Sequence, residues 1–170
     1  MIVRMTKKLQ KSLGIKSLPS NNNSEKPQFL DEWYMNYFNI KSQWFFIFLE
    51  SSTFYTVVKP ATQINGSEMF TKYFMEILIE IINKENDRYK VRDFSINDMH
   101  LRNTENKAER RIMVDMVFHA ERMKFKKGKL DVFEMLNDIP QALLDYNNPR
   151  IVFRKKLFEL LNEGPSISMN

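Results

Sequence analysis

The segment 33–58 places the strongest constraint on how this chain folds, because it holds nearly half of the chain's aromatic residues. In an extended chain, successive side chains lie on opposite sides. One side of residues 44–49 then carries Trp44, Phe46 and Phe48, and the other side carries Phe45, Ile47 and Leu49. Both sides are apolar, so a strand here must be covered on both, or must offer one side to a partner.

A buried helix would also accept such an apolar run. Enrichment in aromatic and β-branched residues, with short polar breaks at 41–43 and 50–53, favours strands joined by tight turns instead. The sequence therefore predicts a meander of three strands at about 32–40, 43–50 and 53–59, closed by Pro60.

Helices are predicted before and after this meander in the sequence. Apolar residues at helical spacing indicate a long helix over about 67–84, with Ser67 or Asn65 as its N-cap. Similar patterns predict helices over about 105–124 and from residue 151 to 163. At the start of the chain we expect a strand at 2–5, then a short helix at 7–13 that Thr6 caps and Gly14 ends.

Two further segments are less clearly patterned. Residues 89–94 have the composition of a short strand, and residues 130–136 fit either a strand or a helix. The polar segment at about 16–28 contains two prolines and is expected to be a mobile loop, while 165–170 should be a frayed tail.

Together these elements predict one α+β domain over residues 1–170. We expect an antiparallel sheet of about four to five strands, with two to three long helices packed on one face. The chain has no cysteine and no apolar run long enough for a membrane span, and its N-terminus lacks the pattern of a secretory signal. A cytoplasmic protein without a membrane partner is the expectation.

The order of these features resembles an uncharacterised bacterial family that is known only as a domain of unknown function. The resemblance rests on the first strand with its Thr6-Lys7-Lys8-Leu9 helix start, on the acidic-Trp and aromatic-strand segment Asp31–Pro60, and on Leu136-Asn137-Asp138-Ile139-Pro140 followed by Tyr146 and Pro149. The segment 110–116 departs from the family pattern, because it lacks a glycine and an asparagine. The resemblance implies a fold and assigns no activity.

Two blocks of the chain are basic and contain no acidic residue. The first block, residues 1–16, carries Arg4, Lys7, Lys8, Lys11 and Lys16, of which the first four are the candidate binding residues. The second block, residues 122–129, carries Arg122, Lys124, Lys126, Lys127 and Lys129, which are all candidates. Such blocks attract phosphate backbones or acidic protein surfaces. The alternative is a solvated face that only keeps the protein in solution.

The aromatic meander offers rings that could stack on nucleobases beside these cations. The candidates are Trp33, Tyr34, Tyr37 and Tyr55, since Trp and Tyr tolerate partial exposure. The alternative for each ring is a place in the core beneath the helix at 67–84. The basic-Gly-aromatic octamer of RNA-recognition domains is absent.

Signs of catalysis are weak. His119 lies one helical turn after Asp115, a spacing that permits a hydrogen-bonded pair but also arises by chance. Glycines are isolated, so no phosphate-binding loop is predicted, and two histidines without cysteine do not suggest a metal site. We predict no catalytic residue, no metal and no cofactor, and a small hydrolase is the less favoured class.

The sequence therefore predicts a non-enzymatic binding protein whose basic face engages RNA or a nucleoprotein. One form of this prediction is an inhibitor of a host defence (CRISPR) system that is encoded by a phage or another mobile element, because such inhibitors often lack a visible active site. The alternative is a protein–protein regulator or a homodimer that acts through the aromatic sheet, for which the eleven methionines would suit an adaptable interface.

Overall fold

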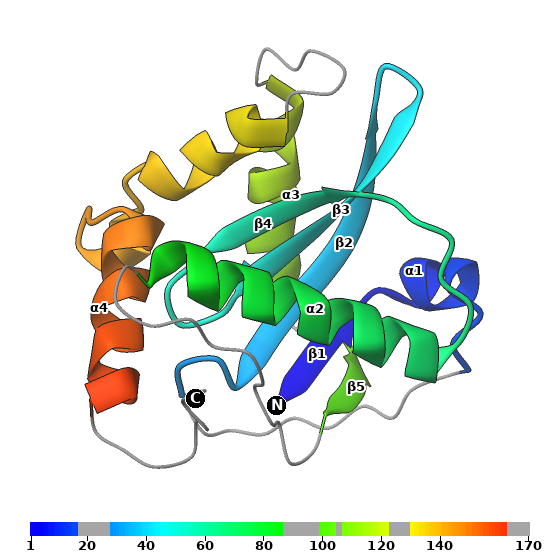
Figure 1. Cartoon of the computed structure of the whole chain (residues 1–170). Coiled ribbons are helices and arrows are strands. Elements are labelled where there is room, and N and C mark those ends of the chain that lie inside the picture. Colours follow the sequence, from blue (N-terminus) through cyan, green and yellow to red (C-terminus); the bar gives the residue numbers. More distant parts are fainter. Residues whose placement is uncertain (17–27, 87–98, 105–106, 123–129, 163–170) are drawn as a thin grey trace.

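The protein is an α+β domain with a five-stranded sheet, as the computed structural model in Figure 1 shows. The structure describes residues 1–16, 28–86, 99–104, 107–122 and 130–162. The strands are β1 (Ile2–Met5), β2 (Glu32–Ile40), β3 (Gln43–Glu50), β4 (Thr56–Pro60) and β5 (His100–Asn103). The helices are α1 (Lys7–Ser12), α2 (Ser67–Glu85), α3 (Lys107–Arg122) and α4 (Pro149–Asn162), with 3-10 helices η1 (Leu130–Asp138) and η2 (Ala142–Leu144).

The sheet is mixed, so the prediction of a purely antiparallel sheet is wrong. Its strand order is β4-β3-β2-β1-β5. β2, β3 and β4 form the predicted antiparallel meander, whereas β1 runs parallel to both β2 and β5. Two parallel strands that follow one another in sequence need a long connection between them, because the second strand must start at the same end of the sheet as the first. The segment between β1 and β2, which includes α1, is this connection.

Both faces of the sheet are covered, so the prediction that helices pack on one face is also wrong. The first face packs Trp33 and Phe48 against Phe74 of α2, which crosses the sheet in Figure 1, and the same core includes side chains of α1 and α4. The second face packs Phe45 against Phe133 of η1 and against α3. The reason lies in β3, whose two apolar sides each need a cover.

Local signals in the sequence set several of these boundaries. Lys41 and Ser42 form the two-residue turn between β2 and β3, and both have positive φ, as hairpin turns of this length require. Thr6 caps α1 by accepting a hydrogen bond from Leu9 N, as predicted, and Gly14 follows the helix with a φ of 64°.

The start of α2 differs from the prediction. Neither Ser67 nor Asn65 is its N-cap: Gly66 holds that position, with a φ of 90° and no side-chain cap. Gly66 N instead donates a hydrogen bond to Leu13 O at 2.8 Å. The backbone at the end of α1 therefore fixes where α2 begins, a long-range contact that local sequence does not reveal.

One of the remaining sequence predictions can be compared with the structure, and three others fall wholly or mostly on residues that the structure does not describe. The ambiguous segment 130–136 belongs to the 3-10 helix η1. The predicted strand at 89–94, the predicted loop over most of its length (17–27) and the predicted tail at 165–170 lie outside the described residues. Within the described part of the chain, no helix is long and apolar enough to cross a membrane.

A buried carboxylate holds the turn between β3 and β4. The side chain of Glu50 is fully buried and accepts hydrogen bonds from the backbone N–H groups of Leu30, Ser52 and Thr53, and from the hydroxyls of Ser52 and Thr53. Burial raises the pKa of Glu50, and these hydrogen bonds oppose the rise without cancelling it.

This raised pKa predicts a pH effect on stability. The folded state binds the Glu50 proton more tightly than the unfolded state does, so the free energy of unfolding should fall as the pH rises from the ordinary value of 4.5 through the folded-state pKa. Chemical denaturation at a series of pH values, for the wild type and Glu50→Gln, measures this. The wild type should lose stability relative to the variant with rising pH; a constant difference would contradict the assignment.

Candidate functional site

The short helix α1 presents a basic surface. Lys7, Lys8 and Lys11 are exposed, and the first turn of the helix contains no acidic residue. On its inner side, Leu9 is buried in the core and Gln10 Nε2 donates to Met5 O at 3.0 Å. The same Gln10 amide also bonds to the side chain of Asn103 in β5. These contacts anchor α1, so its lysines project from a fixed base.

Two aromatic rings lie next to Lys8. Tyr37 of β2 and Trp44 of β3 contact each other near the hairpin turn, with ring centroids 5.0 Å apart and planes inclined by 41°. Lys8 Nζ lies 5.5 Å from the centroid of the Tyr37 ring, within the range of a cation–π interaction. Trp44 is 50% exposed, an unusual exposure for the largest apolar side chain.

The rings form one wall of a cleft of about 670 Å³, which we call the α1–hairpin cleft. Its other walls are α1 and the segment 61–64 that leads toward α2. Apolar side chains, among them Leu13, Phe46 and Ile64, line it, and Thr62 and Gln63 supply polar groups. The cleft thus joins a flat aromatic surface, a cation and hydrogen-bonding side chains, which is the set that binds an unpaired base.

The structure places the predicted site residues in different environments. Lys8 and Tyr37 line the α1–hairpin cleft, and Lys7 and Lys11 are exposed on the same helix. The other site residues predicted in the first block and in the meander are buried; these are Arg4, Trp33, Tyr34 and Tyr55. Buried side chains cannot stack on a base or contact a phosphate, so they do not belong to an exposed surface.

Three of these four buried residues have a polar partner inside the protein, and Trp33 packs its ring against Phe74. Arg4 forms an ion pair with Glu32, which also accepts a hydrogen bond from Tyr34. The hydroxyl of Tyr55 donates to Glu85 at 2.5 Å. Burial raises the pKa of Tyr55, and the hydrogen bond to Glu85 adds to the rise. The ion pair and the hydrogen bonds of these side chains stabilise the interior of the fold.

Sequence reasoning missed Trp44 as a site residue. Alternation correctly placed it on the same side as Phe46, which is buried. The sequence did contain a signal for its exposure, since Trp44 lies one residue into β3, next to the hairpin turn. The end of a strand can extend beyond the helix that covers the middle of the sheet. α2 covers Phe48 and leaves Trp44 open.

Arg122, the member of the second basic block that the structure describes, does not lie on the same face of the sheet as α1. Arg122 is exposed and its guanidinium carbon lies 4.1 Å from the ring centroid of Phe118, so it is held on α3. α3 packs on the second face of the sheet, whereas α1 packs on the first. The remaining cations of this block, Lys124, Lys126, Lys127 and Lys129, lie outside the described residues.

The catalytic candidates gain no support from their geometry. Asp115 is exposed and His119 is partly exposed next to Phe118, and no hydrogen bond joins the acid to the histidine in the described part of α3. Among the described residues, no group of three histidine or acidic side chains is arranged to hold a metal ion.

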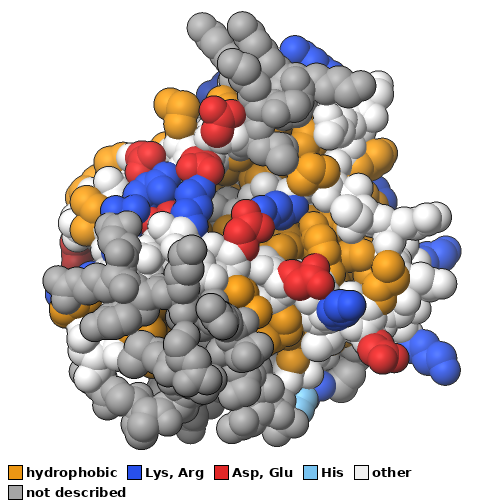
Figure 2. Space-filling model, in the orientation of Figure 1, with side chains coloured by type: hydrophobic (Ala, Val, Ile, Leu, Met, Phe, Trp, Pro, Cys, Tyr) orange, Lys and Arg blue, Asp and Glu red, His pale blue; other side chains and the backbone are white. Residues whose placement is uncertain are grey.

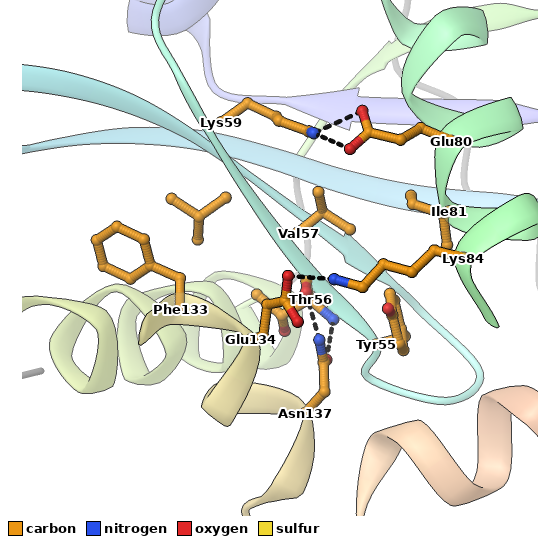
Figure 3. A pocket seen from close by; sticks show the side chains of 11 residues that line it. Tyr55, Thr56, Val57, Lys59, Glu80, Ile81, Lys84, Phe133, Glu134 and Asn137 are labelled. Atoms are coloured by element: carbon orange, nitrogen blue, oxygen red, sulfur yellow. Dashed lines mark hydrogen bonds and ion pairs between the residues drawn. The ribbon is translucent and has the colours of Figure 1, made fainter. Parts of the chain in front are cut away.

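A second cavity, which we call the β4-edge pocket, lies beside the outer strand of the sheet (Figure 3). It has a volume of about 250 Å³ and lies between β4, α2 and η1. Two ion pairs flank it, Lys59–Glu80 at 2.5 Å and Lys84–Glu134. Asn137 reaches across from η1 to the backbone of Thr56, as the dashed lines in Figure 3 show.

The charges on the α2 face are mixed in sign. Figure 2 shows acidic and basic side chains next to one another there, with apolar side chains between them. The two ion pairs of the β4-edge pocket are part of this pattern. Mutual neutralisation leaves little net attraction for a polyanion on this face, in contrast to the acid-free surface of α1.

Comparison with known proteins identifies a family. The model of a domain of unknown function, DUF6933, matches residues 2–156. No curated protein matches the chain significantly.

Proposed function

Since this chain belongs to the DUF6933 family, whose description assigns no activity, we propose a function from its surface: the protein binds single-stranded RNA, free or within a nucleoprotein, without catalysis. The α1 lysines hold the phosphate backbone, and Tyr37 and Trp44 receive an unpaired base. The single observation that carries this proposal is the half-exposed Trp44, which lies against Tyr37 beside Lys8.

A stacking role accounts for the exposure of Trp44 better than a structural role does. A tryptophan used for stability alone gains most when it is buried, as Trp33 is. Trp44 leaves half of its surface in water and offers a flat ring to the α1–hairpin cleft. Aromatic rings beside cations bind single strands in this way with little sequence preference.

The acid-free surface of α1 supports the same proposal. Lys7, Lys8 and Lys11 lie within two turns of one helix and so present several charges over a short distance. Phosphate contacts from such a cluster make binding depend steeply on salt. Duplex RNA should bind more weakly than a single strand, because its bases are paired and cannot enter the cleft.

Replacing Trp44 with alanine tests the proposal. Loss of one stacked base costs about 1–3 kcal/mol, so Trp44→Ala should weaken binding of a fluorescent oligouridylate roughly 5- to 150-fold at low salt. Fluorescence anisotropy measures this. The matched control is Phe158→Ala, which removes a ring of similar exposure from α4 and should leave affinity unchanged. Equal affinity of the wild type and Trp44→Ala would reject the stacking role.

A second candidate function is binding to another copy of the chain. Exposed apolar side chains gather on α4 and the segment before it: Leu143, Ile151 and Phe158 are 74%, 58% and 49% exposed. Leu143 and Ile151 also line a cleft of about 480 Å³. If this surface forms a homodimer, sedimentation equilibrium should show a dimer that Ile151→Arg converts to a monomer; a monomeric wild type would exclude it.

A further inference from the structure

Among the described residues, no strand pairs with the outer edge of β4. The hydrogen bonds that flank the β3–β4 ladder are Glu50 N to Tyr55 O and Ala61 N to Trp44 O, each at 2.9 Å. In an antiparallel pair, bonding to the partner strand alternates along the chain. This register turns the N–H and C=O of Val57 toward β3, and those of Thr56 and Val58 away from it.

The side-chain amide of Asn137 already occupies the first of these outward positions, Thr56. Thr56 N donates to Asn137 Oδ1 at 2.6 Å, and Asn137 Nδ2 donates to Thr56 O at 2.8 Å. The side-chain amide thus makes the pair of bonds that a residue of a neighbouring strand would make. Two residues further along, Val58 presents the same pair of groups, and it lines the β4-edge pocket.

We propose that the β4-edge pocket is a docking site for a short extended peptide segment of a partner protein, which adds to the sheet by exchanging two backbone hydrogen bonds with Val58. We infer a peptide as the occupant because the backbone of an extended peptide provides one N–H donor and one C=O acceptor. These are the same two groups that the Asn137 side chain provides to Thr56. This site is independent of the α1–hairpin cleft and of the RNA-binding proposal.

The surroundings of Val58 limit the length of the bound segment. Asn137 occupies the Thr56 position on one side, and on the other side Pro60 has no N–H to donate. One residue of the peptide therefore pairs with β4, and its neighbours extend over the pocket walls. These walls include Val57, Ile81 of α2 and Phe133 of η1, which favour apolar side chains (Figure 3).

The ion pairs beside the pocket do not close it firmly. In Lys84–Glu134 both side chains are more than 40% exposed, and in Lys59–Glu80 the carboxylate is 60% exposed. Exposed pairs of this kind are weak, so their long side chains can move aside. They remain available to charged groups in the residues that flank the bound segment.

The test is an NMR titration of the whole protein with N-acetyl-Ala-Leu-Ala-amide. Backbone pairing requires no particular sequence, so this peptide should shift the Val58 amide and the Asn137 side-chain amide signals at millimolar concentration. The same peptide with its leucine nitrogen methylated cannot donate to Val58 O, and it should bind at least tenfold more weakly. Unshifted Val58 and Asn137 signals, or equal binding of the methylated peptide, would overturn the proposal.

A proline substitution provides a second test. In Val58→Pro, the lost N–H points away from β3, so the ladder is kept while peptide binding should disappear. Val57→Pro is the matched control, because its lost N–H is bonded to β3; it should destabilise the fold severely. Retention of peptide binding in a folded Val58→Pro would contradict the assignment.

Discussion

Replacing Glu85 with alanine is expected to lower the free energy of unfolding by about 3–5 kcal/mol. The Glu85 carboxylate is fully buried at the end of α2, where it accepts hydrogen bonds from the Tyr55 hydroxyl, Arg150 Nη1 at 2.9 Å and Arg154 Nε at 2.6 Å. Its removal leaves the Tyr55 hydroxyl and both guanidinium groups without their shared acceptor. Denaturation with urea measures the loss.

The matched control is Glu80→Ala on the same helix. Glu80 also pairs with a cation, Lys59, but its side chain is 60% exposed, so its loss should cost less than about 1 kcal/mol. Both substitutions remove one carboxylate from α2, and they differ mainly in burial. Equal effects of the two would show that the Tyr55–Glu85–Arg150–Arg154 network does not hold α4 against α2.

Reversing the charge of the α1 lysines is expected to weaken RNA binding about 100-fold or more at roughly 50 mM salt. The variant Lys7→Glu/Lys8→Glu/Lys11→Glu replaces three phosphate contacts with three repulsions. For single strands, the slope of log affinity against log salt should become shallower by about 2, since each contact contributes about 0.7. Anisotropy titrations with oligouridylate at several salt concentrations give both quantities.

A charge-matched variant separates a local effect from net charge. Reversal of Lys84, Lys155 and Lys156, at the C-terminal end of α2 and on α4, changes the net charge by the same amount at residues that do not line the α1–hairpin cleft. It should weaken binding several-fold at most, through long-range attraction alone. If it weakens binding as much as the α1 variant does, the cation site is not on α1.

Much of this fold could be predicted from the sequence because local rules set it. The two apolar sides of β3 and the polar pair Lys41–Ser42 gave the meander, and helical spacing gave α2. These rules could not predict the direction of β1 relative to β2. No local pattern between Met5 and Glu32 distinguishes a parallel from an antiparallel return of the chain. β5 pairs with β1, about a hundred residues earlier in the sequence, so local rules could not predict this pairing either.

The candidate site was predictable in part, for a related reason. A run of lysines without acids marks an exposed helix face, and α1 carries it. Exposure of an aromatic ring depends on which helix covers which part of the sheet. Trp33 and Tyr55 lie under α2 and α4, and Trp44 does not. Composition alone predicts the same exposure for all three rings, and only the tertiary packing determines which of them is exposed.

The fluorescence of Trp44 tests the central claim most directly. Trp33 is fully buried and Trp44 is half-exposed, so a base that stacks in the α1–hairpin cleft can quench Trp44 alone. Added oligouridylate should quench the emission of the wild type saturably at low salt, high salt should restore it, and Trp44→Phe should show no quenching. Unchanged wild-type emission at RNA concentrations that saturate the anisotropy signal, or no binding at all, would contradict the account.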